Sequence, residues 1–345
     1  MYALHGAHTN VLVQIQWDKP RNALAKLHFY QKGVSQIISW LILKRINKRV
    51  VLKRLLEEPK VSRLKPVSPF AALLLRRKSE RVVVVGDLHI GWEVNLARQG
   101  IHVPSQTSKL LEKAIQVITV CKPTRLILLG DVKHTVARVE IEEWRDVPDF
   151  FEKISKLVLD IEVVPGNHDG NLEPLTPSNV KILPSTGTVL WKSIGIFHGH
   201  AWPSPELLAC DSLIMGHLHP VVMFKDVLGF RIMRQVWVKA KCDGKRLAKA
   251  LLKHLNVTVE GTVADEVKRR FNLGLKNPDC IIMPSFNDFL GGQAINRRLV
   301  RGSKESRAEY IGPVLRSGSI DLDDAEVYLL DGTFLGNIAH LRSYT

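Results

Sequence analysis

The chain has 345 residues, of which 45% are hydrophobic and 24% are charged. This balance is typical of a globular protein and excludes a chain that is disordered throughout. The formal net charge of +15 indicates an anionic partner, such as nucleic acid or a membrane surface.

The positive charge is concentrated in the first 80 residues, which contain 16 Lys and Arg against 4 Asp and Glu. This part therefore has a net charge of +12, and the following 265 residues carry the other +3. Apolar residues at helical spacing, with basic residues between them, predict an amphipathic helix over 34–56. The stretch 57–69 contains three prolines and indicates a linker, so we place a boundary near residue 65. Residues 1–65 are then a basic N-terminal extension.

The extension has three interpretations, and the sequence leaves all three open. It could be a solvated surface segment, a nucleic-acid-binding arm, or a helix that lies on a membrane surface. As an arm, it would neutralise phosphates through Lys44, Arg45, Lys48, Arg49, Lys53 and Arg54.

From residue 66 onward, short apolar runs alternate with helical stretches, which predicts an α/β domain over 66–345. Its motif-bearing core covers 81–240, and 241–345 is an accessory part. Near the end, EVYLLDGTFLGNI over 326–338 predicts two strands joined by a type I′ turn at Asp331 and Gly332. In the core we predict strands at 82–85, 126–129, 161–164, 194–197 and 212–215, and helices at 106–120 and 147–159.

Each of the five core strands is followed at once by a turn that carries Asp, Asn or His. The turns read GDLH, GDVKH, PGNHD, HGH and GHLHP, in chain order. Because ligands bind beyond the carboxyl ends of the strands in open α/β sheets, these groups should meet on one rim. The candidate residues are Asp87, His89, Asp131, His134, Asn167, His168, Asp169, His198, His200, His217 and His219.

The chemistry of this set favours divalent metal ions. Carboxylates, an amide and imidazoles suit manganese, iron or zinc, and no thiolate favours copper(I) or an iron–sulfur cluster. One ion cannot use so many ligands, so we expect two ions, roughly 3.5–4 Å apart, that share a bridging carboxylate. Such a pair keeps the site net positive, which suits an anionic phosphoryl group. It also lowers the pKa of bound water toward ~7.

The ordered series D-x-H, GDxxH, GNHD, HGH and GHxH resembles the calcineurin-like metallophosphoesterase superfamily over roughly residues 70–240. The resemblance implies an α/β sandwich of two mixed β-sheets flanked by helices, and two bound ions, with Mn²⁺ expected before Fe²⁺ or Zn²⁺. The implied ligands are Asp87, His89 and His219 for one ion, Asn167, His198 and His217 for the other, and Asp131 as the bridge.

The same resemblance implies catalytic roles. His168 would contact the phosphate and protonate the leaving oxygen, and Asp169 would orient His168. GDVKH is similar to the SbcD and Mre-type DNA repair nucleases, which implies a catalytic role for His134. DLHIGWE, FHGHAWP and IMPSFNDFLGG (282–292) resemble archaeal phosphoesterases related to SbcD and the bacterial PdeM group. The expected substrate is therefore a phosphodiester in DNA or RNA, with DNA-repair proteins as partners.

Other readings stay open beside this one. The near-neutral charge of 81–345 also allows a phosphatase or phosphodiesterase that acts on small nucleotides or phosphomonoesters. A third possibility is a non-catalytic metal-binding interaction module, although the presence of His168 disfavours it. The least favoured interpretation is that the polar residues of the five motifs only cap strands and turns. Within HGH, His200 could replace His198 as the ligand, and we favour His198.

Cysteines and apolar segments bear on the cellular location. The four cysteines are far apart and form no C-x-x-C pair, which indicates reduced, mostly buried thiols. The sequence contains no secretory signal pattern and no apolar run long enough to cross a bilayer. We therefore expect a cytoplasmic protein without a transmembrane segment.

Overall fold

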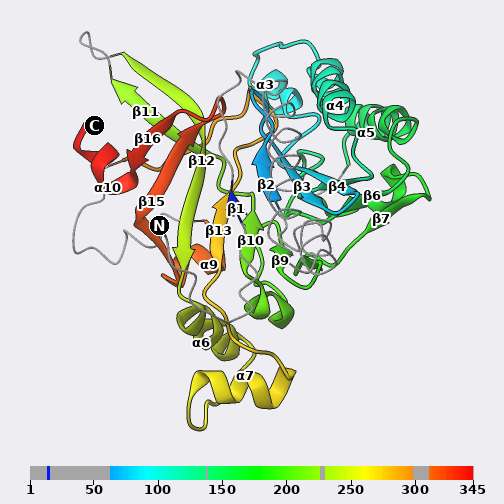
Figure 1. Ribbon diagram of the computed structural model, residues 1–345. Coiled ribbons are helices and arrows are strands. Elements are labelled where there is room, and N and C mark those ends of the chain that lie inside the picture. The colour runs from blue at the N-terminus through cyan, green and yellow to red at the C-terminus, as the bar shows by residue number, and fades with distance from the viewer. Residues whose placement is uncertain (1–13, 16–62, 137–138, 226–229, 298–310, 345) are drawn as a thin grey trace, which may run out of the picture.

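The computed structural model describes residues 14–15, 63–136, 139–225, 230–297 and 311–344. The helix expected over 34–56 lies outside these residues. Figure 1 shows two β-sheets packed against each other, with helices on their outer sides. The predicted α/β sandwich of two mixed sheets flanked by helices is confirmed. Within the described part of the chain, no helix has the length and apolar character needed to cross a membrane.

The first sheet holds its strands in chain order, from β1 to β7. Strands β2, β3 and β4 are antiparallel neighbours, and β4 to β7 run parallel. Strand β2 crosses the boundary that we expected near residue 65. The strands are β1 (Gln14–Ile15), β2 (Arg63–Pro66), β3 (Ala72–Arg77), β4 (Glu80–Val85), β5 (Arg125–Leu128), β6 (Ile161–Val163) and β7 (Val180–Ile182).

The second sheet has the order β14-β11-β12-β13-β10-β9-β8, and β15 and β16 extend it from β12. Strands β9, β10 and β13 are parallel, whereas β12 is antiparallel to β11, β13 and β15. The strands are β8 (Thr188–Leu190), β9 (Ile194–Ile196), β10 (Ser212–Met215), β11 (Pro220–Lys225), β12 (Arg231–Cys242), β13 (Asp279–Ile282), β14 (Gln293–Ala294), β15 (Ile320–Leu329) and β16 (Phe334–Asn337).

Burial on both faces explains why the strands that lead to the predicted site are so apolar. In β4, Val83 and Val85 face a core that includes residues of the two long helices. Val82 and Val84 face the core between the two sheets. Since side chains alternate across a strand, a strand covered on both faces needs apolar residues at every position. The five predicted core strands are all present, within two residues of their expected ends.

The helices agree less closely with expectation. Helix α4 (Thr107–Cys121) matches the predicted 106–120, but α5 (Ile141–Ser155) begins six residues before the predicted 147–159. Its start is fixed by a capping box between Glu140 and Glu143, and the helix runs through Pro148. The other helices are α3 (Glu93–Arg98), α6 (Gly244–His254), α7 (Val263–Phe271), α9 (Pro313–Arg316) and α10 (Ile338–Leu341), with 3₁₀ turns η1 (Glu173–Leu175), η2 (Pro205–Ala209) and η3 (Arg342–Tyr344).

Two smaller predictions have mixed outcomes. The hairpin near the C-terminus is present as β15 and β16, but its turn is not type I′. That turn needs positive φ at both central residues, and of Asp331 and Gly332 only the glycine has it, at 89°. The four cysteines are buried and free, as predicted.

Candidate metal centre

The turns that follow the parallel strands meet on one rim of the sandwich. The turn after β4 is hydrogen-bonded to the turn after β5: the Asp87 N–H donates to the Gly130 carbonyl (3.0 Å) and the His89 N–H to the Asp131 carbonyl (2.8 Å). The Gly216 N–H, after β10, donates to the His198 carbonyl after β9 (3.0 Å). Backbone pairing between turns therefore brings residues from distant parts of the chain together.

Asp131 lies at the centre of this rim. Its Oδ2 is 3.3 Å from His89 Nε2 and 3.4 Å from His198 Nε2, and its side chain is buried. Its Oδ1 accepts a hydrogen bond from the His168 backbone N–H (2.9 Å). Glycine is required opposite this carboxylate, because a Cβ on Gly166 would lie 2.1 Å from Asp131 Oδ1. Asp131 thus faces two sets of imidazoles at once.

Among the residues that the structure describes, three groups of side chains bring potential ligand atoms within 4.8 Å of one another. Two of these groups contain Asp131, as a shared bridging ligand requires. The groups are Asp87, His89, Asp131 and His219; Asp131, His198 and His217; and His89, His134 and His168.

Unpaired nitrogens show that the first two groups fit metal ions. The Nε2 atoms of His89, His198 and His219 are buried, and none has a hydrogen-bond partner among the described residues. They nevertheless lie close to carboxylates; His219 Nε2 is 3.0 Å from Asp87 Oδ1. Leaving such atoms unpaired is costly, and a cation bound between imidazole nitrogen and carboxylate oxygen satisfies both.

His198 is oriented as a ligand would need to be. Its Nδ1–H donates to the Leu129 carbonyl (2.9 Å), so Nε2, 3.4 Å from Asp131 Oδ2, is the nitrogen that can hold either a proton or a metal ion. Only glycine fits beside this ring, since a Cβ on Gly130, whose φ is 75°, would lie 2.2 Å from His198 Nδ1. Within the HGH motif, His198 is therefore the residue that lies with Asp131 in a group able to hold a metal ion.

The charges in the centre favour bound cations. Burial alone would raise the pKa of Asp131, but the imidazoles of His198 and His89 outweigh it and hold the pKa below its usual range. Burial alone would lower the pKa of His198, but Asp131 and Asp87 raise it to about 9. Asp87 raises the pKa of His219 in the same way. Two buried carboxylates thus attract positive charge, which protons supply when metal does not.

Three further imidazoles are neutral at neutral pH. Burial lowers the pKa of His217 and of His200 to about 4 in each case. The pKa of His134 is also about 4, because of burial and the neighbouring rings of His89 and His168. His200 belongs to none of the three groups, and its ring centroid lies 5.3 Å from that of His198. It lies beside the centre, and the choice of His198 over His200 as the ligand stays a prediction.

Strained backbone holds several of these side chains in place. Five of them have left-handed φ, which costs of order 1–3 kcal/mol for each residue without a compensating structure. The intervening Leu88 and Leu218 are buried and anchor the D-x-H and H-x-H turns. The φ values are 58° at Asp87, 46° at His89, 50° at Asp131, 66° at His217 and 46° at His219.

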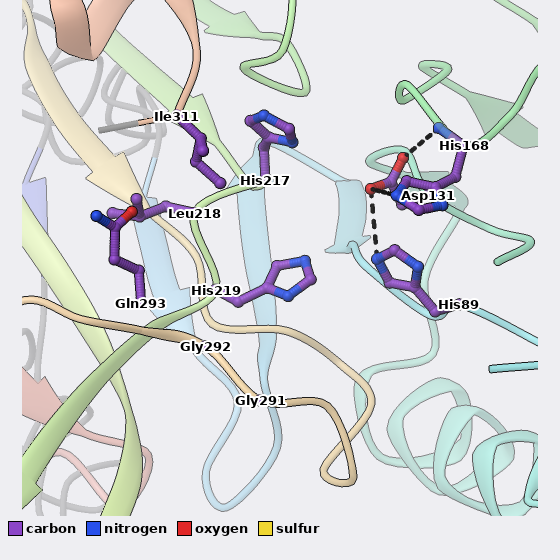
Figure 2. Close-up of a pocket in the computed structure, with 10 residues that line it drawn as sticks. All are labelled: His89, Asp131, His168, His217, Leu218, His219, Gly291, Gly292, Gln293 and Ile311. Atoms are coloured by element: carbon purple, nitrogen blue, oxygen red, sulfur yellow. Dashed lines mark hydrogen bonds and ion pairs between the residues drawn. The ribbon is translucent and has the colours of Figure 1, made fainter. Parts of the chain in front are cut away.

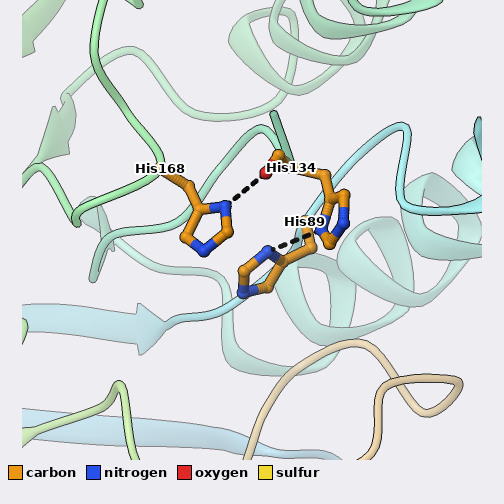
Figure 3. A group of neighbouring side chains, drawn as sticks. All are labelled: His89, His134 and His168. Atoms are coloured by element: carbon orange, nitrogen blue, oxygen red, sulfur yellow. Dashed lines mark hydrogen bonds between the residues drawn. The ribbon is translucent and has the colours of Figure 1, made fainter. Parts of the chain in front are cut away.

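Figure 3 shows the third group, in which His89, His134 and His168 converge. His89 Nδ1 lies 3.1 Å from His134 Nδ1, and the His168 ring contacts the His134 carbonyl through Nδ1. His168 Nε2 then points toward Asp131 Oδ2, 4.0 Å away, from a side chain that is 22% exposed. A substrate can therefore reach His168.

Asp169 has a different place from the one expected. Its Oδ2 accepts from the Gly166 N–H (2.8 Å) and its Oδ1 from the Val132 N–H (2.8 Å). The His168 ring is held instead by the His134 carbonyl. Burial and nearby Asp131 raise the pKa of Asp169 to about 6. Asp169 thus fixes the two turns that carry Asp131 and His168, and acts on His168 only through the backbone.

Asn167 is the expected ligand that the structure supports least directly. It lies in the turn after β6, between Gly166 and His168, and its side chain is exposed. Its role as a ligand stays a prediction.

Other residues around the centre were not predicted. The Nδ2 atom of Asn95 lies 2.6 Å from His134 Nε2. Buried Glu143 accepts from the N–H groups of His134 (3.0 Å) and Thr135 (2.7 Å). The sequence could have indicated Glu143, because it follows Glu140 by three residues, the spacing of a capping box. No sequence pattern indicates Asn95.

The segment after β13 is hydrogen-bonded to the turn that carries Asp87 and His89, and we call these contacts the clamp. Asn287 Nδ2 donates to the Leu88 carbonyl (2.9 Å), and Ser285 Oγ donates to the Asp87 carbonyl (2.8 Å). Both residues are buried. The clamp belongs to the accessory part that the sequence placed outside the motif core.

A cavity of about 490 Å³ opens beside the centre. Figure 2 shows His217 and His219 on one side of it, and His89, Asp131 and His168 on the other. Gly291 and Gly292 lie below these side chains in this view, and Gln293 lies beyond His217 and His219, next to Leu218.

The match to a protein family agrees with this geometry. The model of the calcineurin-like phosphoesterase family matches residues 80–282. No curated protein matches the sequence. Among solved structures, the nuclease MPE of Pseudomonas putida is 16% identical, with a TM-score of 0.42, and the match covers 78% of this chain and 97% of that one. YfcE, a phosphoesterase from E. coli, is 19% identical, with a TM-score of 0.28, and the match covers 42% and 73%.

Proposed function

The chain belongs to the calcineurin-like phosphoesterase family, and from this premise we propose that this metal-dependent hydrolase cleaves phosphodiester bonds in DNA or RNA. The observation that carries the hydrolytic part is the place of Asp131 between two ligand groups. The net charge of +15 and the similarity of GDVKH to nuclease motifs support nucleic acid as the substrate.

In this proposal, two divalent ions share Asp131. Manganese suits the mixture of carboxylate and imidazole ligands, with iron(II) and zinc as alternatives. When bound, the ions supply positive charge for the phosphoryl oxygens and water with a lowered pKa. The proposed ligands are Asp87, His89 and His219 on one side, and Asn167, His198 and His217 on the other.

His168 is the proposed general acid. With Nδ1 held at the His134 carbonyl, Nε2 is the atom that can give a proton to the leaving oxygen. His134 has a pKa of about 4 and is neutral at pH 7, so it is better suited to hydrogen bonding than to supplying a proton. Asp169 keeps the turns of Asp131 and His168 in register.

The test is a parallel assay with Mn²⁺ on bis-p-nitrophenyl phosphate, p-nitrophenyl phosphate and single-stranded DNA. We expect diester and DNA hydrolysis, and a loss of about 10²–10⁴-fold in kcat for His168→Ala, the usual contribution of a general acid. His102→Ala, at an exposed position, is the matched control and should stay near wild type. Turnover of the monoester alone would contradict the proposed substrate, and no turnover with Mn²⁺, Fe²⁺ or Zn²⁺ would contradict the proposed activity.

A second candidate is a phosphatase or phosphodiesterase for small nucleotides. One observation favours it: residues 81–345 have a net charge of only +3, whereas a long polynucleotide track usually carries more cations. Four statements stay predictions. They are the alternative of a non-catalytic interaction module, the DNA-repair partners, the cytoplasmic location and the role of residues 1–65.

A further inference from the structure

We propose that a base of the substrate, next to the scissile phosphate, stacks on the ring of Phe289, and that Lys109 binds a phosphate of the same substrate. The proposal rests on the function proposed above, because it concerns the same site. A nucleic-acid strand and a small nucleotide share the chemistry required, a flat base joined to a phosphate. We call Trp92, Lys109 and Phe289 the platform.

The platform brings three segments of the chain together. Trp92 lies in the turn before α3, Phe289 in the segment after β13, and Lys109 in α4. The rings of Trp92 and Phe289 are stacked, with centroids 5.9 Å apart and planes at 16°. Lys109 Nζ is 5.1 Å from the centroid of the Phe289 ring, so both side chains belong to one surface. Phe289 is nevertheless 48% exposed, and Lys109 is exposed as well.

Hydrogen bonds join both rings of the platform to the turn after β4. The Trp92 N–H donates to the His89 carbonyl (3.1 Å). The Phe289 N–H donates to Asn287 Oδ1 (3.0 Å), and Asn287 Nδ2 donates to the Leu88 carbonyl (2.9 Å). The turn that carries proposed metal ligands therefore also fixes the position of the two rings.

The platform borders the cavity beside the metal centre. Gly291 and Gly292 line this cavity. Gly291 is two residues from Phe289, which is at most ~7 Å along the chain. A phosphodiester has a substituent on each side of the phosphate, so a substrate bound in the cavity extends past its rim. The Phe289 ring is an exposed surface at that rim on which a base can stack.

The segment that carries Phe289 is held against α4. Lys113 Nζ donates to the Phe286 carbonyl (2.6 Å) and to Asp288 Oδ1 (2.6 Å), and it lies 4.6 Å from the centroid of the Phe286 ring. A ring on a fixed support loses little conformational freedom when a ligand binds, which favours affinity. The Lys113–Asp288 salt bridge also neutralises the carboxylate next to Phe289, so that it repels a phosphate less.

Lys109 is available to a phosphate. It forms no salt bridge with another described residue, and its contact with the Phe289 ring is a cation–π interaction. At an exposed site such an interaction is weaker than a stacked base or a hydrogen bond between an ammonium and a phosphate. A nucleotide that replaces it therefore gains a ring for its base and a cation for its phosphate.

This combination fits a nucleotide better than a protein partner. Specific protein interfaces bury several hundred Å² on each side, with an apolar centre from which charged residues are depleted. The Phe289 ring instead lies beside the charged side chains of Lys109 and Asp288. A single exposed ring with an adjacent cation is the arrangement found where bases stack and phosphates are neutralised.

The first experiment varies the base and keeps the leaving group. The substrates are p-nitrophenyl thymidine 5′-phosphate, p-nitrophenyl thymidine 3′-phosphate and p-nitrophenyl methyl phosphate, with Mn²⁺. We expect Phe289→Ala to lower kcat/KM by at least about fivefold for one or both thymidine esters, and by less than about twofold for the methyl ester. Phe289→Tyr keeps the ring and should recover the rate. The matched control is Phe334→Ala, at a ring that is 57% exposed and 5.1 Å from the Tyr328 ring.

The second experiment tests Lys109 and the source of the nucleotide. Fluorescence anisotropy with labelled dT20 at several salt concentrations gives the salt slope of binding. We expect Lys109→Ala to reduce this slope by about 0.7, the value for one phosphate contact on a single strand. Lys249→Ala, at an exposed position of α6, is the control. An unchanged slope in Lys109→Ala would remove the phosphate contact, and binding of thymidine 5′-monophosphate without binding of dT20 would assign the platform to small nucleotides.

Other outcomes would overturn the stacking itself. Equal losses of Phe289→Ala on the thymidine and methyl esters would show that the ring supports the metal centre and does not contact a base. Unchanged rates on both thymidine esters would remove Phe289 from substrate binding. If the wild type hydrolyses no substrate, the proposed function fails. Calorimetry with thymidine 5′-monophosphate and 2-deoxyribose 5-phosphate then still tests the platform, and equal affinities for the two would contradict it, because only the first has a base.

Discussion

His198 is completely buried between two carboxylates, and they raise its pKa to about 9 despite the burial that opposes the charged form. Its folded-state pKa is therefore above the reference value of 6.5. The stability that this proton gives the metal-free protein is complete below about pH 6.5 and is lost as the pH rises through about 9.

Metal binding should show the opposite trend. A metal ion must displace the His198 proton, so we expect affinity for Mn²⁺ to increase by up to about tenfold per pH unit between pH 6.5 and 9. Calorimetry in buffers of different ionisation enthalpy would detect the released proton. Metal affinity that is flat over this range, with no proton release, would show that His198 is not displaced on binding.

Asn95 is the last residue in a hydrogen-bond chain that runs from His89 through His134, so we expect it to affect activity. If His89 binds a metal through Nε2, its Nδ1–H must donate to His134 Nδ1. His134 Nε2 then carries a proton, and the Asn95 amide must turn its oxygen toward that nitrogen.

We therefore expect Asn95→Ala to lower kcat/KM for bis-p-nitrophenyl phosphate by about 10–100-fold, the usual effect of losing a partner of a ligand. Asn95→Asp keeps an acceptor and should recover much of the rate. Equal losses in both variants would contradict this chain.

Among the secondary-structure elements, the segment after β13 holds the turn after β4 in place. The two segments are 199 residues apart in the chain. The Asn287 amide donates to the Leu88 carbonyl, between the proposed ligands Asp87 and His89. Removing it leaves a buried acceptor unpaired and frees a strained turn.

Asn287→Ala should therefore weaken binding at the Asp87–His89 site by about 10–100-fold. Metal content after dialysis, measured by plasma mass spectrometry, would fall from two equivalents toward one. Asn256→Ala, at an exposed position, is the control. Two retained equivalents in Asn287→Ala would show that the clamp has no part in metal binding.

At the scale of the whole molecule, the core between the sheets joins the two halves of the metal centre. Ile214 of β10 is completely buried in it, together with residues of β4 and β5. Each sheet supplies part of the ligand set, so the centre depends on how the sheets pack.

Ile214→Ala should lower the free energy of unfolding by about 2–5 kcal/mol, the usual cost of this truncation in a core. Urea unfolding followed by circular dichroism and by tryptophan fluorescence should show the same midpoint, because both sheets share this core. Leu159→Ala, at a residue that is 86% exposed, should change stability little. Separate midpoints would indicate sheets that unfold independently.

The strands, the turns that follow them and the type of candidate ligand in each turn could all be predicted from the sequence. These features are local: an apolar run buried on both faces must be a core strand, and its carboxyl end must turn at the rim. Since parallel strands end on the same side of a sheet, the convergence of Asp87, Asp131 and His198 was also predictable.

The groups that hold these side chains in place could not be predicted and became visible with the packing of the two sheets. Asn287 is hydrogen-bonded to the Leu88 carbonyl, 199 positions away in the chain. His198 is hydrogen-bonded to the Leu129 carbonyl, 69 positions away. Asp169 binds the turn after β5 rather than the His168 ring. No local pattern specifies such pairs, because a buried hydrogen bond depends on which backbone groups the packed sheets leave without a partner.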